Sequence, residues 1–248
     1  MGTILNLAAY HFVPLTDLPE WRQRLWDSAS AAQLKGTVLL AEEGINLFVA
    51  GPEAPVRQWW RELAALPGLA PLKAKESWSD AVPFKHLRVK IKREIIRMNQ
   101  PAIAPVGGRA PAVSATTLQR WLQQGHDDDG RPVLTLDTRN RFEVDAGRFS
   151  GALDWDLQKF SDFPQALAAH AEALQHHTVV SYCTGGIRCE KAALLMQQAG
   201  LRHAFQLDGG ILQYFEDCPG APHWDGDCVV FDERGAVNAS LQPSAAKR

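Results

Sequence analysis

The segment Val179–Gly200, VVSYCTGGIRCEKAALLMQQAG, constrains the fold more than any other part of this chain. A short apolar run leads through a loop with two glycines into a helix-like stretch that stops at a glycine. Around it, the strand-like runs VLTLDTR and HAFQLDGG alternate with the helix-like runs VSATTLQRWLQQG and FPQALAAHAEALQHH. Such alternation, with near-continuous apolar strands, is typical of a parallel sheet covered by helices on both faces. We therefore expect an α/β domain over residues 112–222.

The first hundred residues follow a different pattern. Strand-like and helix-like runs appear in the order β-α-β-β-α-β, which is the order of a ferredoxin-like α+β fold, and we expect this domain over residues 1–97. Residues 98–111 contain three prolines and two glycines without periodicity, so they are predicted to form a linker. Residues 223–248 are expected to be a C-terminal segment that ends in a disordered tail, VNASLQPSAAKR.

Composition limits the classes of partner. The formal net charge is −2, so no global positive field indicates nucleic acid, although a local basic patch is compatible with it. The N-terminal residues lack the pattern of a signal peptide. No apolar run approaches the roughly 20 residues of a membrane span. We expect a cytoplasmic protein without a membrane partner.

The four cysteines, Cys183, Cys189, Cys218 and Cys228, all lie in the last third of the chain. In a reducing compartment they are more readily understood as reactive thiols or metal ligands than as disulfides. None of their spacings matches a zinc knuckle, and a fourth ligand beside Cys218, His223 and Cys228 is missing from the sequence. The sequence therefore predicts no metal site, and structural roles for Cys218 and Cys228.

Cys183 is the candidate nucleophile. It lies at the carboxyl end of a predicted strand, where parallel sheets bind their ligands. Only the thiolate is a good nucleophile, and the loop offers anion-stabilising groups: backbone amides at a helix N-terminus, two glycines that let those amides turn inward, and one arginine. The site is predicted to comprise Cys183, Thr184, Gly185, Gly186, Ile187 and Arg188. The alternative is a buried structural cysteine at a strand end.

Four residues separate Cys183 from Arg188, one fewer than in the phosphate loop of cysteine phosphatases, so phosphatase activity is disfavoured. CTGGIR resembles the active-site loop of rhodanese domains, and LDTRNRFEVDAGRFSGALDWDL and LDGGI extend the resemblance, with Gly147-Arg148 where Gly-His is commoner. YCTGGIRCEKA, together with LAEEGIN, LRVKIKREII and CVVFDER, resembles the rhodanese-like tRNA uridine hydroxylases. The resemblance covers residues 3–235 and implies a short form without a cysteine-rich C-terminal extension.

This resemblance implies a rhodanese-like domain preceded by an acylphosphatase-like, ferredoxin-like domain. It also implies hydroxylation of the tRNA wobble uridine (position 34) to 5-hydroxyuridine, with molecular oxygen as co-substrate and no other cofactor evident. The alternative is a thiosulfate or persulfide sulfurtransferase, in which Cys183 carries a persulfide taken from a small sulfur donor. A third interpretation is a non-catalytic sulfur carrier or RNA-binding module. The sequence specifies neither the tRNAs nor the oligomeric state.

Supporting roles are predicted for several further residues. Asp137 and Arg139 end a neighbouring strand and are expected to fix the loop by hydrogen bonding. Cys189 is either a small helix-start residue or a resolving thiol. Glu190 is expected to complement the helix dipole, and Lys191 to face the substrate.

For RNA, we expect a basic row on one face of a strand to contact phosphates, the alternative being a solvated face. Its members are Lys85, Arg88, Lys90, Lys92 and Arg93. Leu87, Val89 and Ile91 would be buried on the other face. Tyr182 and Trp155 are candidates for stacking an unstacked base. The turn Glu42–Asn46 is either a glycine-requiring β-turn or part of the site.

Overall fold

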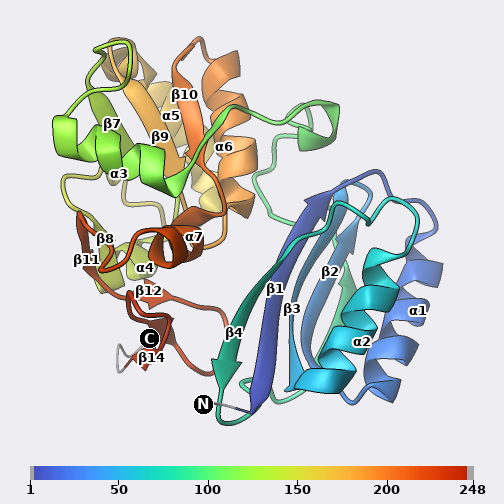
Figure 1. Ribbon diagram of the computed structural model, residues 1–248. Coiled ribbons are helices and arrows are strands. Elements are labelled where there is room, and N and C mark those ends of the chain that lie inside the picture. Colours follow the sequence, from blue (N-terminus) through green and yellow to red (C-terminus); the bar gives the residue numbers. More distant parts are fainter. Residues whose placement is uncertain (1–2, 245–248) are drawn as a thin grey trace. The chain divides into compact units, whose positions relative to one another are not determined.

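The computed structural model describes residues 3–244, which form two compact units that divide between Arg97 and Met98 (Figure 1). The expectations for residues 1–2 and 245–248 lie outside the described residues. Within residues 3–244, no helix has both the length and the apolar character needed to cross a bilayer.

The first unit is a five-stranded sheet with two helices on one face (Figure 1). Its elements are β1 (Ile4–Phe12), α1 (Leu18–Ala31), β2 (Lys35–Ala41), β3 (Gly44–Pro52), α2 (Glu53–Ala64), β4 (Ala74–Ser79) and β5 (Leu87–Ile91). The strand order is β4-β1-β3-β2-β5, with antiparallel pairing except between β2 and β5. The first four strands have the ferredoxin-like order, as expected.

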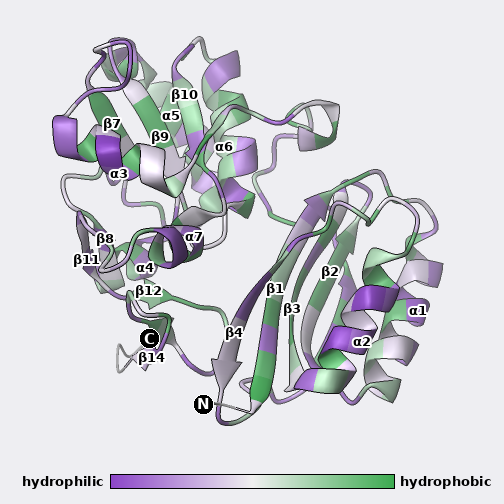
Figure 2. Ribbon diagram, in the orientation of Figure 1, coloured by the Kyte–Doolittle hydropathy of each residue, from purple (hydrophilic) through white to green (hydrophobic). Residues whose placement is uncertain are grey.

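The core of this unit follows the alternation of side chains along the strands. Leu5 and Leu7 of β1 and Leu47 and Val49 of β3 are buried in one apolar cluster with Trp59 of α2. Figure 2 shows hydrophobic residues along these strands and hydrophilic residues on the outer surfaces of the helices. The two helices therefore cover only one face of the sheet.

The fifth strand, β5, lies where a strand with a basic row was predicted, and it is one element more than the β-α-β-β-α-β order contains. The run HLRVKIKREII pairs with β2 only over Leu87–Ile91, because β2 turns back into β3 just beyond that point. At this edge of the sheet, Arg22 of α1 donates from Nε to the carbonyl of Val89 at 3.1 Å. The helix thus satisfies a carbonyl that an edge strand would leave open.

The second unit is built around a parallel four-stranded sheet of order β6-β10-β9-β7. Its elements are β6 (Ala112–Val113), α3 (Ala115–Gln124), β7 (Val133–Asp137), α4 (Arg141–Ala146), β8 (Gly147–Phe149), α5 (Phe163–His170), β9 (Thr178–Tyr182), α6 (Ile187–Gln198), β10 (Ala204–Leu207), α7 (Gly210–Asp217), β11 (Trp224–Gly226), β12 (Cys228–Val229), β13 (Ala236–Val237) and β14 (Pro243–Ser244). Short 3₁₀ segments lie at Pro105–Gly107, Phe160–Asp162 and Ala171–Leu174.

Helices cover both faces of this sheet, as the alternating sequence predicts. All five residues of β9 are buried. Val180 and Tyr182 lie in an apolar cluster with residues of α3 and α7, and α6 packs on β9 and β10 with α5 beside it (Figure 1). The central strand therefore places its carboxyl end, and Cys183, at the middle of the domain.

Two chain segments are more ordered than the sequence suggests. In the predicted linker, the carbonyls of Ala110 and Pro111 accept hydrogen bonds from Gln206 of β10, so this part is fixed to the second unit. The predicted disordered tail is wrong for residues 237–244. Val237 is buried in the cluster of α3 and α7, and β13 pairs with β12 and β14. Burial of apolar side chains from residues 224–237 explains the order.

Candidate active site

The loop between β9 and α6 begins at Cys183, and its backbone is hydrogen-bonded to the start of α7. The N–H groups of Ile211 and Leu212 donate to the carbonyls of Cys183 and Thr184, at 2.9 and 3.1 Å. Gly210 has a φ of +67°, and a Cβ there would lie 2.4 Å from the Cys183 carbonyl oxygen. The sequence LDGGI therefore needs its second glycine, because the helix start lies against the loop backbone.

The loop directs hydrogen-bond donors at the sulfur of Cys183. Gly186 has a φ of +96°, and its N–H donates to Sγ at 3.2 Å. Burial raises the pKa of the Cys183 thiol, but a hydrogen bond from the Cys189 thiol, the charge of Arg188 and the amides of Arg188 and Gly186 together lower the pKa to about 6. The arrangement favours a thiolate at neutral pH.

The thiolate is enclosed by protein. Cys183 is only 1% exposed, and within the loop only Gly185 and Ile187 are more than marginally accessible. A nucleobase or a sulfur donor therefore reaches the sulfur only after groups over the loop have moved. The expected anion-stabilising groups are present, whereas the open approach that a nucleophile needs is absent from this conformation of the described chain.

Arg188 is bound by a carboxylate that the sequence reasoning did not single out. Its Nη1 and Nη2 donate to the two carboxylate oxygens of Glu143, each at 2.7 Å, and both side chains are buried. Burial raises the pKa of Glu143, but the charges of Arg188 and Arg139 outweigh this and lower it. The sequence feature that could have indicated Glu143 is the acidic residue in RFEVDAG, within the rhodanese-like stretch. Its partner, Arg188, lies 45 residues further along the chain.

An exposed aromatic ring lies over the same guanidinium. The ring centroid of Phe231 is 5.9 Å from Cζ of Arg188, and Phe231 is 43% exposed. Phe231 belongs to the C-terminal CVVFDER segment, which the sequence indicated only through its resemblance. The loop is therefore bordered by one large apolar side chain that solvent can reach.

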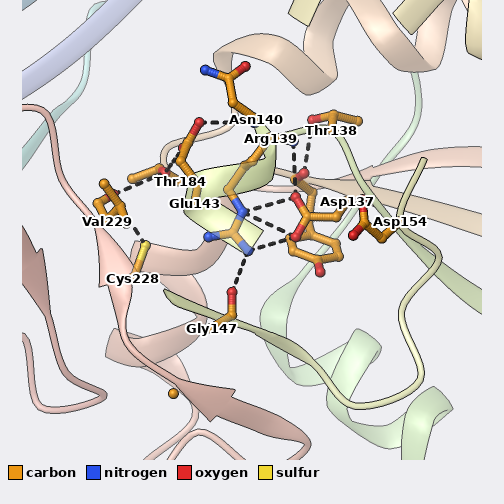
Figure 3. Close-up of polar contacts among 12 residues, drawn as sticks. Asp137, Thr138, Arg139, Asn140, Glu143, Gly147, Asp154, Thr184, Cys228 and Val229 are labelled. Carbon is orange, nitrogen blue, oxygen red and sulfur yellow. Dashed lines mark hydrogen bonds and ion pairs between the residues drawn. The ribbon is translucent and has the colours of Figure 1, made fainter. Parts of the chain in front are cut away.

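Asp137 and Arg139 form a fully buried ion pair (Figure 3). Nη2 of Arg139 bonds Asp137 Oδ2 at 2.6 Å and the carbonyl of Gly147 at 2.5 Å. The pair thus ties the end of β7 to β8. The hydrogen bonds to the residue before the active-site loop, which were expected from Asp137 and Arg139, come instead from Thr138. Its N–H and its hydroxyl donate to the Tyr182 carbonyl at 3.1 and 2.9 Å.

The first turn of α6 is buried, which changes two of the expected roles. Glu190 accepts hydrogen bonds from Arg109 at 2.7 Å and from Gln206 at 2.8 Å, so it fixes the segment before β6 in addition to lying at a helix start. Lys191 is 1% exposed and is enclosed in this conformation. Cys189 is fully buried, with its sulfur 3.6 Å from Thr138 Oγ1.

Comparisons with known proteins agree with both parts of this architecture. Residues 4–95 match the family described as "UPF0176 acylphosphatase like domain", and residues 114–217 match the rhodanese-like domain. The tRNA uridine(34) hydroxylase of Delftia acidovorans is 59% identical over 97% of this chain and 91% of its own length. Those of Bordetella petrii and Bordetella pertussis are 58% and 55% identical over 99% of this chain, and 97% and 100% of their own lengths.

This chain belongs to the tRNA uridine(34) hydroxylase family. The resemblance noted in the sequence is confirmed, and so is the combination of an acylphosphatase-like and a rhodanese-like domain.

The five basic residues that were predicted to contact phosphates all belong to the first unit. Lys85, Arg88, Lys90, Lys92 and Arg93 are all exposed. Val89 is buried against the helices, so Arg88 and Lys90 lie on the helix-free face of the sheet. Ile91, expected to be buried with Val89, is 41% exposed, because β5 ends there beside the β2–β3 turn.

The turn Glu42–Asn46 contacts the chain segment that follows β5. The carboxylate of Glu43 accepts from the N–H of Ile95 at 2.7 Å, and Nδ2 of Asn46 donates to the carbonyl of Ile95 at 3.1 Å. Both backbone groups of Ile95 are thereby held. The turn has a structural role: it fixes the chain that follows Lys92 and Arg93.

The two residues predicted to stack an unstacked base, Tyr182 and Trp155, both make aromatic contacts within the second unit. Tyr182 is fully buried, and its ring meets Phe149 at 4.9 Å. Trp155 stacks on His170 at 5.3 Å and packs against Phe163 at 5.5 Å. The prediction is wrong for Tyr182, whose ring solvent does not reach, whereas for the half-buried Trp155 it stays a prediction. Phe231 is the exposed ring beside the loop.

Cys218 and Cys228 are buried free thiols. Burial raises the pKa of Cys228 to about 12, although Arg139 and a hydrogen bond with Thr184 oppose this. Thr184 also bonds the carbonyl of Val229 at 3.4 Å (Figure 3). Within residues 3–244, no group of three or more His, Cys, Asp or Glu side chains is placed to hold a metal ion.

Proposed function

We propose that this protein hydroxylates uridine 34 of tRNA to 5-hydroxyuridine, with molecular oxygen as co-substrate and Cys183 as the nucleophile. The observation that supports this most is the near full-length similarity to tRNA uridine(34) hydroxylases, combined with an intact loop that stabilises the Cys183 thiolate. We also infer that the reaction takes place in the cytoplasm, where tRNA is available.

In this proposal the Cys183 thiolate adds to C6 of the uracil ring. The S–C6 bond forms, the C5–C6 double bond opens, and the electron pair is delocalised from C5 into the C4 carbonyl as an enolate. The ring becomes electron-rich at C5, the carbon that is oxidised. The loop donors that stabilise the thiolate, the Gly186 amide and Arg188, also stabilise anionic charge beside it.

The electrons and protons that the oxygen step consumes determine what the assay must contain. Insertion of one oxygen atom of O₂ at C5 leaves the second atom to depart as water, which requires two electrons and two protons. The assay therefore supplies a low-molecular-weight thiol, two molecules of which give up two electrons and two protons as they form a disulfide. Collapse of the adduct releases the C5 proton to water, restores the C5–C6 double bond, breaks the S–C6 bond and returns Cys183 to the thiolate.

The uridine has to leave its stack to reach an enclosed sulfur. A flipped base is held by stacking on aromatic side chains, and Phe231 is the exposed ring over Arg188. We propose that the wobble base stacks on Phe231 as it approaches the loop. Arg88 and Lys90 on the helix-free face of the first unit, together with the exposed Lys85, Lys92 and Arg93, are proposed to contact tRNA phosphates.

The test uses purified protein, tRNA from cells lacking the gene, O₂ and the thiol donor, followed by mass spectrometry of the nucleosides. We expect 5-hydroxyuridine with the wild-type protein and none with Cys183→Ala or without O₂. Undiminished product with Cys183→Ala would reject the nucleophile, and no product with the wild type would reject the reaction.

The second candidate, a sulfurtransferase, is favoured by one observation: the amide of Gly186 and the charge of Arg188 converge on the sulfur, as a persulfide anion requires. In that reaction Cys183 takes the outer sulfur of thiosulfate and releases sulfite, and cyanide then removes the sulfur as thiocyanate. Thiocyanate at rates unaffected by tRNA would favour this function. Inactivity in both assays would favour a sulfur carrier or RNA-binding module.

A further inference from the structure

The sheet of the first unit has one face that its helices do not cover (Figure 1). Leu7 of β1 and Leu47 of β3 are buried on the helix side. Glu76 of β4 also points to that side, because Arg57 of α2 donates to its carboxylate at 3.0 and 3.1 Å. Side chains alternate along a strand, so the residues next to these in sequence lie on the helix-free face.

One row of side chains crosses all five strands on the helix-free face. The strand register aligns, from β4 to β5, Lys75, Ala8, Phe48, Thr37 and Arg88. Phe48 lies in the central strand β3 and is half-buried, whereas Arg88 is exposed. The row therefore has an aromatic ring at the centre of the sheet and a cation on each edge strand.

Tyr10 of β1 gives the same face a second ring. It lies diagonal to Phe48 across the β1–β3 pair, a spacing within the reach of aromatic side chains. Its ring also meets Phe12 edge to face, with 6.1 Å between the centroids. Tyr10 and Phe48 are both half-buried, so the sheet supports each ring while part of it stays accessible to solvent.

The charge on the helix-free face is positive. Lys35, opposite Ala50, and Lys90, opposite Leu39, add two exposed cations to Lys75 and Arg88. In β1–β5, whose residues are all described, no position on this face is Asp or Glu. Aromatic rings stack on bases and cations attract the phosphates between them. A duplex keeps its bases inside its own stack, so this combination fits unpaired RNA.

We propose that the helix-free face of the first unit binds unpaired bases of tRNA by stacking them on Phe48 and Tyr10. The basic edge strands hold the flanking phosphates, so this face recognises bases in addition to the phosphate contacts of Arg88 and Lys90. The inference rests on tRNA being the substrate in the proposed function. It adds to that function a surface that distinguishes unpaired from paired RNA.

The experiment measures binding by fluorescence anisotropy, with the full-length protein and a labelled single-stranded RNA of seven nucleotides. The same strand in a duplex is the second probe, and O₂ is left out so that no turnover occurs. Phe48→Leu keeps apolar volume without a π face and should weaken single-strand binding roughly 5- to 150-fold. Phe48→Tyr should bind like the wild type. Trp26→Leu, which removes an exposed ring of α1, is the control and should change nothing.

The loss caused by Phe48→Leu should be the same at every salt concentration, because stacking releases no counterions. Tyr10→Leu tests the second ring and replaces Phe48→Leu if that variant fails to fold. Leucine variants that bind single strands as tightly as the wild type would overturn the proposal. An equal loss on the duplex would also overturn it, because the ring would then only support the fold.

Failure of this inference differs from failure of the proposed function. Wild-type protein that hydroxylates tRNA without binding the single strand more tightly than the duplex overturns only the stacking face. Tight single-strand binding that depends on Phe48, without any hydroxylation of tRNA, supports the stacking face and rejects the reaction.

Discussion

Arg188 and Glu143 form a buried, two-pronged ion pair with both Nη···Oε distances at 2.7 Å. The cation that ends the active-site loop is therefore fixed from α4, an element outside the strand–loop–helix unit that carries Cys183. This geometry locks the guanidinium in one plane beneath the ring of Phe231. The loop depends on an interaction that local sequence does not reveal, and the pair should be sensitive to removal of either charge.

Glu143→Gln should destabilise the protein, because it leaves the buried charge of Arg188 unpaired. Loss of one partner of a buried pair typically costs about 3–5 kcal/mol. Chemical denaturation measures the change in the free energy of unfolding. Glu172→Gln is the control, since Glu172 is exposed. Equal unfolding free energies for the two variants would show that the pair contributes nothing to stability.

Gly210→Ala should displace the active-site loop. A Cβ at Gly210 would meet the Cys183 carbonyl oxygen at 2.4 Å and the Gly186 nitrogen at 2.8 Å. Gly220→Ala is the matched control, with a φ of +76° and nothing within 4 Å of its Cβ. The control should lose about 1–2 kcal/mol from the left-handed backbone alone. Gly210→Ala should lose about 1–3 kcal/mol more through overpacking, together with hydroxylase activity. Equal losses in the two variants would refute the close packing.

The ionisation of Cys183 should make stability depend on pH. Its pKa falls from the ordinary value near 9 to about 6 on folding. Between those values the unfolded chain binds more protons, so the free energy of unfolding rises with pH from about 6 to 9. We expect the difference between wild type and Cys183→Ser to grow over this range, by at most ~4 kcal/mol. Cys218 and Cys228 are present in both proteins and their titration cancels, while burial keeps the pKa of Cys189 raised in both. A difference that stays flat with pH would mean that Cys183 is protonated in the fold.

The parts of the site that local sequence encodes were predictable. A strand that ends just before Cys183, glycines that permit an inward loop and a helix that begins near Arg188 all lie within one short segment, where backbone geometry dominates. The partners from elsewhere were not. Glu143 and Phe231 reach Arg188 only through tertiary packing, and no periodicity encodes that meeting.

The burial of individual side chains was the second feature of the site that the sequence did not predict. Lys191 and Tyr182 have side chains that sequence reasoning places near substrate, yet packing encloses both. The C-terminal segment has a composition typical of a disordered tail. It is ordered because Trp224 and Val237 are buried in the apolar cluster of the second unit, which the sequence does not reveal. The β-α-β-β-α-β pattern and a strand carrying Arg88 and Lys90 were predictable, whereas the short length of β5 and its parallel pairing with the open side of β2 were not.

Replacing Arg88 and Lys90 together by alanine should weaken tRNA binding and flatten its salt dependence. Removal of one phosphate-neutralising charge makes the slope of log K against log salt shallower by about 0.7–0.9. Filter binding or fluorescence anisotropy over a range of salt concentrations gives the slope. Arg24→Ala with Arg61→Ala removes two exposed charges from α1 and α2, on the helix-covered side, and should leave the slope unchanged. The same slope in both double variants would mean that the row is only a solvated face.

Phe231→Ala should impair use of tRNA while the Cys183 thiolate stays intact. Stacking of a base on an aromatic ring contributes about 1–3 kcal/mol, so kcat/KM for tRNA should fall roughly 5- to 150-fold. Phe231→Tyr keeps the ring and should retain activity, whereas Phe231→Leu keeps apolar volume without a π face and should resemble alanine. Trp26→Ala, which removes a similarly exposed ring on α1, is the control. Single-turnover nucleoside analysis gives kcat/KM, and thiol titration confirms that Cys183 still ionises normally. A leucine variant as active as the tyrosine variant would show that Phe231 acts through its volume over Arg188 and not by stacking a base.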